Sequence, residues 1–194
     1  MISITKTFPL LVAPILLSGC SLLATLEDAK KFEEVVDDLP NYTDATTEDI
    51  PPSGTSEFEG GLLMANDTNE ALLADLAASV NFESGSFSGS ASEIRLIDTT
   101  AESWQDALQA VKKNYTGTAD WDGSITGTDV SSSGSGTISA DGIDYTFSFT
   151  ADGKLYLDGE DVLTMGSTSG AIGSLTAEGG ESNEFDGGFY AKEM

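Results

Sequence analysis

The stretch "GIDYTFSFT" (Gly142–Thr150) decides the fold class of this chain. Large apolar residues occupy every second position, and Asp, Thr and Ser stand between them. Successive side chains of a β-strand point to opposite faces, so this alternation predicts one face in a core and the other in solvent. The core-facing residues would be Ile143, Tyr145, Phe147 and Phe149.

Asp-Gly pairs interrupt the chain on both sides of this stretch. They begin at residues 122, 141, 152, 158 and 186. Asp-Gly between alternating segments is the strongest short-range signal for a two-residue hairpin. Five such hairpins favour an antiparallel meander, because parallel strands need long crossover connections.

Two other segments need a choice between helix and strand. "NEALLADLAASVNF" (69–82) is rich in helix formers, and Asp67 with Glu70 fits a capping box, but its apolar residues also alternate with period two from residue 72 to 82. We interpret it as a strand because a Gly/Ser turn and another alternating segment follow it. "TTAESWQDALQAVKKNY" (99–115) instead predicts a short helix over residues 100–113, with a capping box at Thr99 and Glu102.

The first 19 residues have the layout of a secretory signal peptide. Lys6 precedes an apolar run from Phe8 to Leu17, which ends in the small residues Ser18 and Gly19. A run of this length is too short to span a bilayer stably. We therefore expect residues 1–19 to be removed from the mature protein.

The only cysteine follows this run directly. Leu17-Ser-Gly-Cys20 resembles the bacterial lipobox, in which cleavage precedes the cysteine and its thiol receives a diacylglycerol. The resemblance implies lipid attachment at Cys20, a membrane anchor of two or three acyl chains, and, with Ser21 next, the outer membrane, with its face left open. The alternatives are an ordinary signal peptide with an incidental cysteine, or a buried N-terminal helix.

Residues 20–55 are predicted to be a lipidated acidic tether. Apolar residues near helical spacing between Leu22 and Leu39 predict a short helix that Pro40 ends. Its polar face is mostly Glu and Asp, which favours a helix in solvent or packed on the domain over one lying on the membrane. The following stretch, "NYTDATTEDIPPSGTSE" (41–57), is typical of a flexible spacer.

Composition excludes several classes of function. The chain has no histidine, which excludes an imidazole base, a histidine metal ligand and a Ser-His-Asp triad. Its formal net charge of −25 opposes binding to nucleic acid and to anionic lipid headgroups. Such acidity suits a saline habitat or, as a sharper alternative, a cationic partner.

Four segments of the C-terminal part carry a resemblance to a known family. They are "ASVNFESGSFSGS" (78–90), "YTGTADWDGSITGT" (115–128), "GSGTISADGIDYTFSF" (134–149) and "FDGGFYAKE" (185–193). Together they resemble the C-terminal barrel of transferrin-binding-protein-like surface lipoproteins, which include factor H binding protein. Ala191 stands where that family usually has glycine. The resemblance implies an eight-stranded barrel over residues 56–194 and a role in binding.

The fold prediction is therefore a mainly β protein: a soluble antiparallel eight-stranded β-barrel with one short helix, preceded by the tether. Closure removes the exposed edge strands that would otherwise pair with other chains. Faces rich in Ser, Thr and Asp do not fit the apolar outer band of a membrane-spanning barrel.

No motif in the chain predicts catalysis. Asp120 and Asp122 resemble the start of an EF-hand loop, but Ile125 and Ser131 stand where that loop needs Gly and Glu. Alternation also puts Trp121 on the opposite face from both acids, which predicts a core tryptophan between two solvated carboxylates. A weaker calcium site at turn carboxylates stays open, and we name no catalytic, metal or cofactor residue.

Two functions of different kinds remain. The barrel is a module that binds an unknown solute or protein, or it is a structural envelope lipoprotein with no ligand; an enzyme ranks third. If the barrel binds, the candidate loops are residues 98–115 and 166–184, the longest interruptions of the strand pattern.

Overall fold

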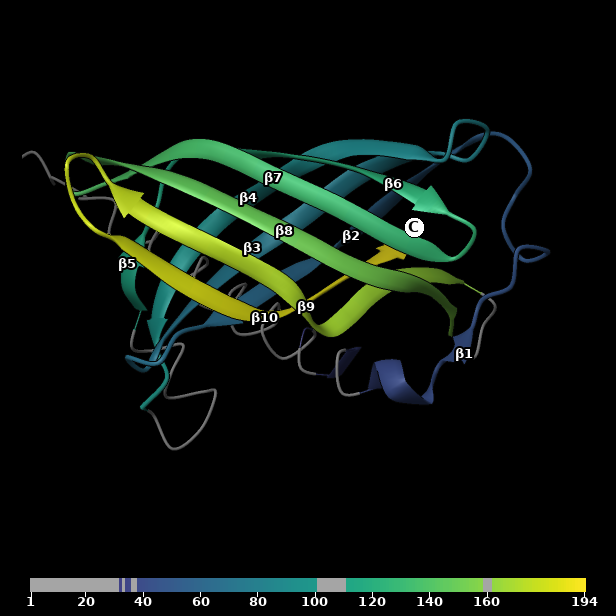
Figure 1. Cartoon of the computed structure of the whole chain (residues 1–194), viewed down its shortest axis with the longest axis horizontal. Coiled ribbons are helices and arrows are strands. Elements are labelled where there is room, and N and C mark those ends of the chain that lie inside the picture. The colour runs from purple at the N-terminus through teal and green to yellow at the C-terminus, as the bar shows by residue number, and fades with distance from the viewer. Residues whose placement is uncertain (1–31, 33, 36–37, 101–110, 159–161) are drawn as a thin grey trace, which may run out of the picture.

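The computed structural model describes residues 32, 34–35, 38–100, 111–158 and 162–194. Cys20, the signal peptide and residues 101–110 of the predicted helix lie outside the described residues. Eight long strands make up most of the described part (Figure 1). They are β2 (Thr55–Ala65), β3 (Glu70–Asn81), β4 (Ser86–Asp98), β6 (Ala119–Thr126), β7 (Asp129–Ala140), β8 (Ile143–Leu157), β9 (Leu163–Ala177) and β10 (Ser182–Glu193).

These strands form a closed antiparallel barrel. Each strand pairs with the next in the order given, and β10 pairs with β2, with Phe189 opposite Leu62. The predicted eight-stranded barrel is therefore confirmed. The strand predicted over residues 72–82 is confirmed as β3, whose Leu72, Leu76 and Val80 face the core.

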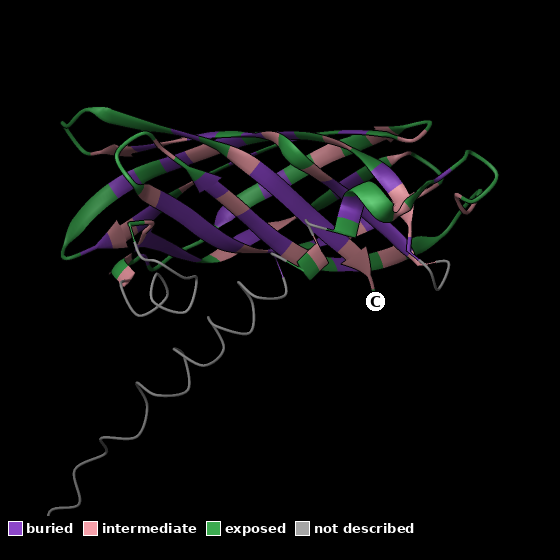
Figure 2. Cartoon of the chain, turned by 90° about the horizontal axis from the view of Figure 1, so that it is seen from below, coloured by how far each residue is buried: buried purple, intermediate pink, exposed green. Residues whose placement is uncertain are grey.

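Burial follows the predicted alternation along the strands (Figure 2). In β7 the exposed positions are Asp, Ser or Thr, whereas Val130 and Ile138 are buried. Tyr145, Phe147 and Phe149 of β8 are buried as expected, but Ile143 is 45% exposed because it directly follows the hairpin turn at the barrel end. The barrel thus has an apolar inside and a polar outside.

The interior is packed with side chains from all eight strands. Trp121 and Phe147 are fully buried, and the Trp121 ring meets Phe87 edge to face at 4.9 Å between centroids. Trp121 Nε1 donates to Ser132 Oγ at 3.0 Å, and Ser132 Oγ donates to the Ala151 carbonyl at 2.7 Å. These two consecutive hydrogen bonds satisfy both the indole N–H and the buried hydroxyl.

The prediction that all five Asp-Gly pairs are hairpin turns was wrong. Among the four pairs that lie wholly within the described residues, only Asp141-Gly142 forms a two-residue hairpin, with φ values of 55° and 77° that both lie in the left-handed region. The pairs at residues 122, 152 and 186 lie inside β6, β8 and β10. There glycine supplies space: a Cβ on Gly123 would overlap the Phe87 ring.

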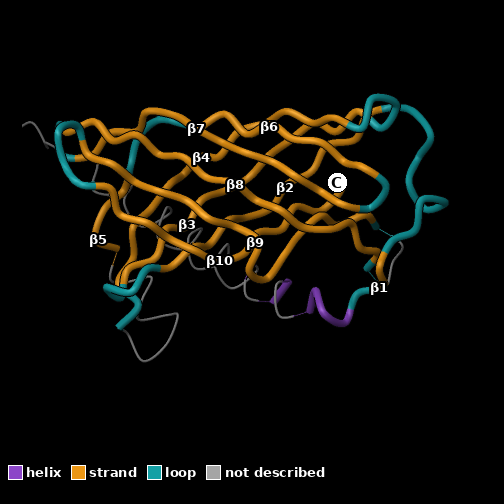
Figure 3. Tube along the Cα trace, in the orientation of Figure 1, coloured by secondary structure: helices purple, strands orange, loops and turns teal. Residues whose placement is uncertain are grey.

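Two short strands lie beside the barrel (Figure 3). β5 (Val111–Asn114) pairs with β4 where the β4–β6 pairing has ended. The predicted helix over residues 100–113 is therefore wrong at Val111–Lys113. The unpaired edge of β4 offers backbone hydrogen bonds there, and this tertiary contact overrides local helix propensity.

The segment predicted to be a flexible spacer is partly bound to the barrel. β1 (Thr43–Asp44) pairs with the end of β8, which extends beyond β7, and Ala45 is buried. An exposed strand edge attracts a partner strand, which explains this pairing. The spacer prediction is thus wrong at these residues.

The tether helix packs on the domain, one of the two predicted alternatives. Residues 32, 34, 35 and 38 are helical, and a 3-10 turn, η1 (Leu39–Asn41), follows. Phe32 and Leu39 are buried. The α-helical residues end at Asp38, and Pro40 lies in the 3-10 turn directly after them, as predicted for a helix that this proline ends.

Candidate functional site

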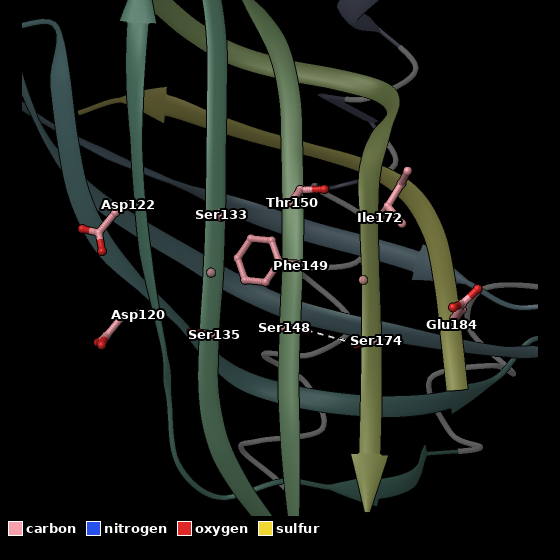
Figure 4. A pocket seen from close by; sticks show the side chains of 12 residues that line it. Asp120, Asp122, Ser133, Ser135, Ser148, Phe149, Thr150, Ile172, Ser174 and Glu184 are labelled. Atoms are coloured by element: carbon pink, nitrogen blue, oxygen red, sulfur yellow. Dashed lines mark hydrogen bonds between the residues drawn. The ribbon is translucent and has the colours of Figure 1, made fainter. Parts of the chain in front are cut away.

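Because side chains fill the barrel, the candidate sites lie in its wall and on its outer surface. One is a shallow groove across β6 to β10, with a volume of about 610 Å³ (Figure 4). We call it the serine groove. Its floor includes outward-facing Ser133, Ser135, Ser148, Thr150 and Ser174.

Acidic side chains border the serine groove. Asp120 and Asp122 lie on one side of it and Glu184 on the other, next to Ile172, which is 63% exposed (Figure 4). Ser148 Oγ and Ser174 Oγ are hydrogen-bonded at 3.0 Å across β8 and β9. This surface can exchange hydrogen bonds with hydroxyl groups and can attract cationic groups. The predicted core tryptophan between two solvated acids is confirmed.

The other site is a recess of about 500 Å³ where the barrel wall opens beside β4. β4 pairs with β6 up to Ala91 and with β5 from Arg95, and Glu93 between them has φ +49°. A bulge displaces β4 here, since the β3 partners change from Asp75 opposite Ser92 to Leu73 opposite Arg95. We call this opening the arginine recess.

Arg95 lines the arginine recess, and Lys112 and Lys113 lie beside it on β5. Arg95, Lys112 and Lys113 are three of the five basic residues in the described part of the chain. Lys112 Nζ lies 3.2 Å from Glu70 Oε1 and 3.4 Å from Asp98 Oδ2, and the bond to Glu70 contributes most to raising the Lys112 pKa. Hydrogen bonds from Thr100 are the main cause that lowers the pKa of Asp98.

Two tyrosines join this cluster to the barrel core. Lys113 Nζ donates to the Tyr145 hydroxyl at 2.6 Å and lies 4.9 Å from the centre of its ring. Tyr115 packs edge to face on Tyr145 with centroids 5.2 Å apart. Burial is the main cause that raises the Tyr115 pKa, so its hydroxyl stays neutral at physiological pH.

The structure gives different outcomes for the two predicted candidate loops. Residues 166–184 are not a loop, because β9 and β10 cover all but residues 178–181. Of residues 98–115, the described part contributes Asp98 and β5 to the arginine recess region. Arg95 was not among the predicted site residues, although it is the single arginine of a very acidic chain. The β4 bulge has no comparable signal in the sequence.

Comparison of the chain with protein-family models, with curated proteins and with solved structures found no match. In the described ranges, no helix is both long and apolar enough to cross a membrane. The described residues also contain no group of three or more acidic or cysteine side chains that could hold a metal ion.

Proposed function

We propose that this chain is a lipid-anchored protein of the bacterial outer membrane whose barrel binds a solute or protein on its outer surface. The lipobox at Leu17–Cys20 supports the anchor, and the resemblance to transferrin-binding-protein-like lipoproteins supports a role in binding. The chain has no histidine, and the two candidate sites offer hydrogen-bonding groups and charge. The proposal therefore includes no catalytic role.

The position of the tether carries the proposal. Phe32 packs on Tyr190 of β10, with ring centroids 5.6 Å apart, and lies beside Gly61 of β2. In the closed strand order β7 lies across the barrel from β2, and the serine groove is centred on β7 and β8. The helical part of the tether around Phe32 and the centre of the groove therefore lie on different sides of the barrel, and only the later part of the tether, at β1, reaches the end of β8. An anchor that holds the β2–β10 side toward the membrane leaves the groove facing away from the membrane.

Replacing Cys20 with alanine is expected to release the protein from the membrane fraction and to abolish its labelling by a radioactive fatty acid. Stable attachment needs the acyl chains that the thiol would carry. Ser21→Ala is the matched control, since it leaves the cysteine in place. Unchanged labelling of Cys20→Ala would contradict the anchor.

The binding role is tested by filling the serine groove. Ser148→Arg places a long cationic side chain on its floor, whereas Ser79→Arg places the same side chain on the outer face of β3, outside the groove. We expect the intact protein to retain a ligand or partner from native membranes or growth medium, Ser79→Arg to retain it, and Ser148→Arg to lose it. If the intact protein retains nothing under any condition, the structural envelope role replaces binding.

A further inference from the structure

Arg95 holds a buried and incompletely paired charge. The residue is 6% exposed, and its Nη1 has no hydrogen-bond partner among the described residues. Burying a charged donor without a partner is costly, and native structures rarely leave such a group unsatisfied without a functional reason. Arg95 also lines the arginine recess, so a ligand bound there would lie beside this incompletely paired guanidinium.

Glu93 does not satisfy this arginine. Its Oε2 lies 3.4 Å from Arg95 Nη2, at the long end of hydrogen-bond distance, and its side chain is 67% exposed. Exposed ion pairs contribute little stability, and a planar guanidinium can donate to a second carboxylate from its other nitrogen. The left-handed φ of Glu93 belongs to the bulge that opens the recess beside this guanidinium.

The rest of the recess combines apolar and polar groups. Val111 and Tyr115 line it together with Asn114, Thr116 and Thr118. Its volume of about 500 Å³ is in the range of small-molecule sites, which are mostly apolar with a few polar groups that fix the ligand's orientation. An inorganic anion would pair with the arginine but leave most of this space unused.

We propose that the arginine recess binds a small organic carboxylate, whose charged group pairs with the Arg95 guanidinium while its apolar part packs on Val111 and Tyr115. The inference goes beyond the proposed binding function, because it adds a second site apart from the serine groove and names the ligand class of that site. The net charge of −25 repels anions at long range, so the bound carboxylate depends on short contacts with this one buried cation.

The first experiment titrates the full chain, purified in detergent, with phenylacetate by isothermal titration calorimetry. Phenylacetamide has the same shape without the charge, and sulfate has charge without the apolar part. We expect saturable binding of phenylacetate at least about tenfold tighter than that of either control, because a hydrogen bond to a charged group is worth that much. Equal binding of phenylacetamide, preferred binding of sulfate, or no saturable binding of phenylacetate would overturn the proposal.

Variants then test the role of Arg95. Arg95→Met keeps most of the side-chain volume and removes the charge, and Lys154→Met removes one exposed positive charge from β8. We expect phenylacetate binding to weaken about tenfold or more in Arg95→Met and to stay unchanged in Lys154→Met. Equal affinities for the wild type and folded Arg95→Met would refute the assignment.

Hydrogen exchange of the wild type gives a test that does not depend on how the variant folds. Phenylacetate should slow exchange in peptides that cover residues 92–97 and 111–118. Protection elsewhere without protection there would place the site outside the recess. If phenylacetate does not bind in the recess, while Cys20 is still labelled and Ser148→Arg loses its ligand, this inference is wrong and the proposed function stands.

Discussion

Replacing Trp121 with alanine is expected to lower the free energy of unfolding by about 3–5 kcal/mol, as truncation of a buried aromatic side chain does. The indole is fully buried and packs edge to face on Phe87 and, at 6.5 Å, on Phe189. Alanine leaves a cavity that rigid neighbouring strands can fill only partly. Urea unfolding followed by circular dichroism at 25 °C measures the change.

Asp122→Ala is the control, because Asp122 is exposed on the same strand. Surface changes of this kind usually alter stability by less than about 0.5 kcal/mol. Trp121→Phe should fall between the two, since it keeps much of the ring but removes the hydrogen bond to Ser132. A Trp121→Ala protein as stable as Asp122→Ala would mean that the tryptophan is not in the core.

Replacing Gly134 with alanine is expected to destabilise the barrel by about 1–3 kcal/mol or more, through overpacking. A Cβ there would overlap the Phe149 ring and lie 2.7 Å from the Asp120 carbonyl oxygen. An aromatic ring within a packed core and a strand backbone can move little. The same urea titration measures the loss.

Gly173→Ala is a matched control from the other side of the same phenylalanine. Gly134, Phe149 and Gly173 are register partners across β7, β8 and β9. The new Cβ at Gly173 would lie 2.6 Å from Met64 Cε, the end of a flexible side chain that can move away. We expect a smaller loss, and Phe149→Leu should recover part of the Gly134→Ala loss. Equal losses at both glycines would contradict the steric explanation.

The parts of the fold that depend on local pattern were predictable. Alternation over residues 143–149 and 72–82 reports which side of a strand is buried, and this holds for almost any barrel. Asp-Gly was misleading because a glycine required by a neighbouring ring looks the same in sequence as one required by a turn. Gly123 next to Phe87 shows the difference, which only the strand register reveals.

The features that depend on distant strand edges were not predictable. β1 and β5 form where β8 and β4 extend beyond their neighbours, so their own sequences carry little of the cause. The arginine recess depends on a bulge in β4 and on the position of β5. The serine groove was not predictable either, because small polar residues on neighbouring strands form a groove only once the strands lie side by side.

Closure of the barrel by β2 and β10 affects when the chain can fold during its synthesis. Leu62 and Phe189 are opposite each other although most of the domain separates them along the chain. Until β10 is available, β2 and β9 each keep an unpaired edge, so a growing chain cannot complete its core. Pairings this distant in sequence also slow folding, into the range of about milliseconds to seconds. In the exported lipoprotein that we propose, late closure would keep the chain open while it is threaded through a translocation channel, and any chaperone that accompanies it would have these two edges to shield.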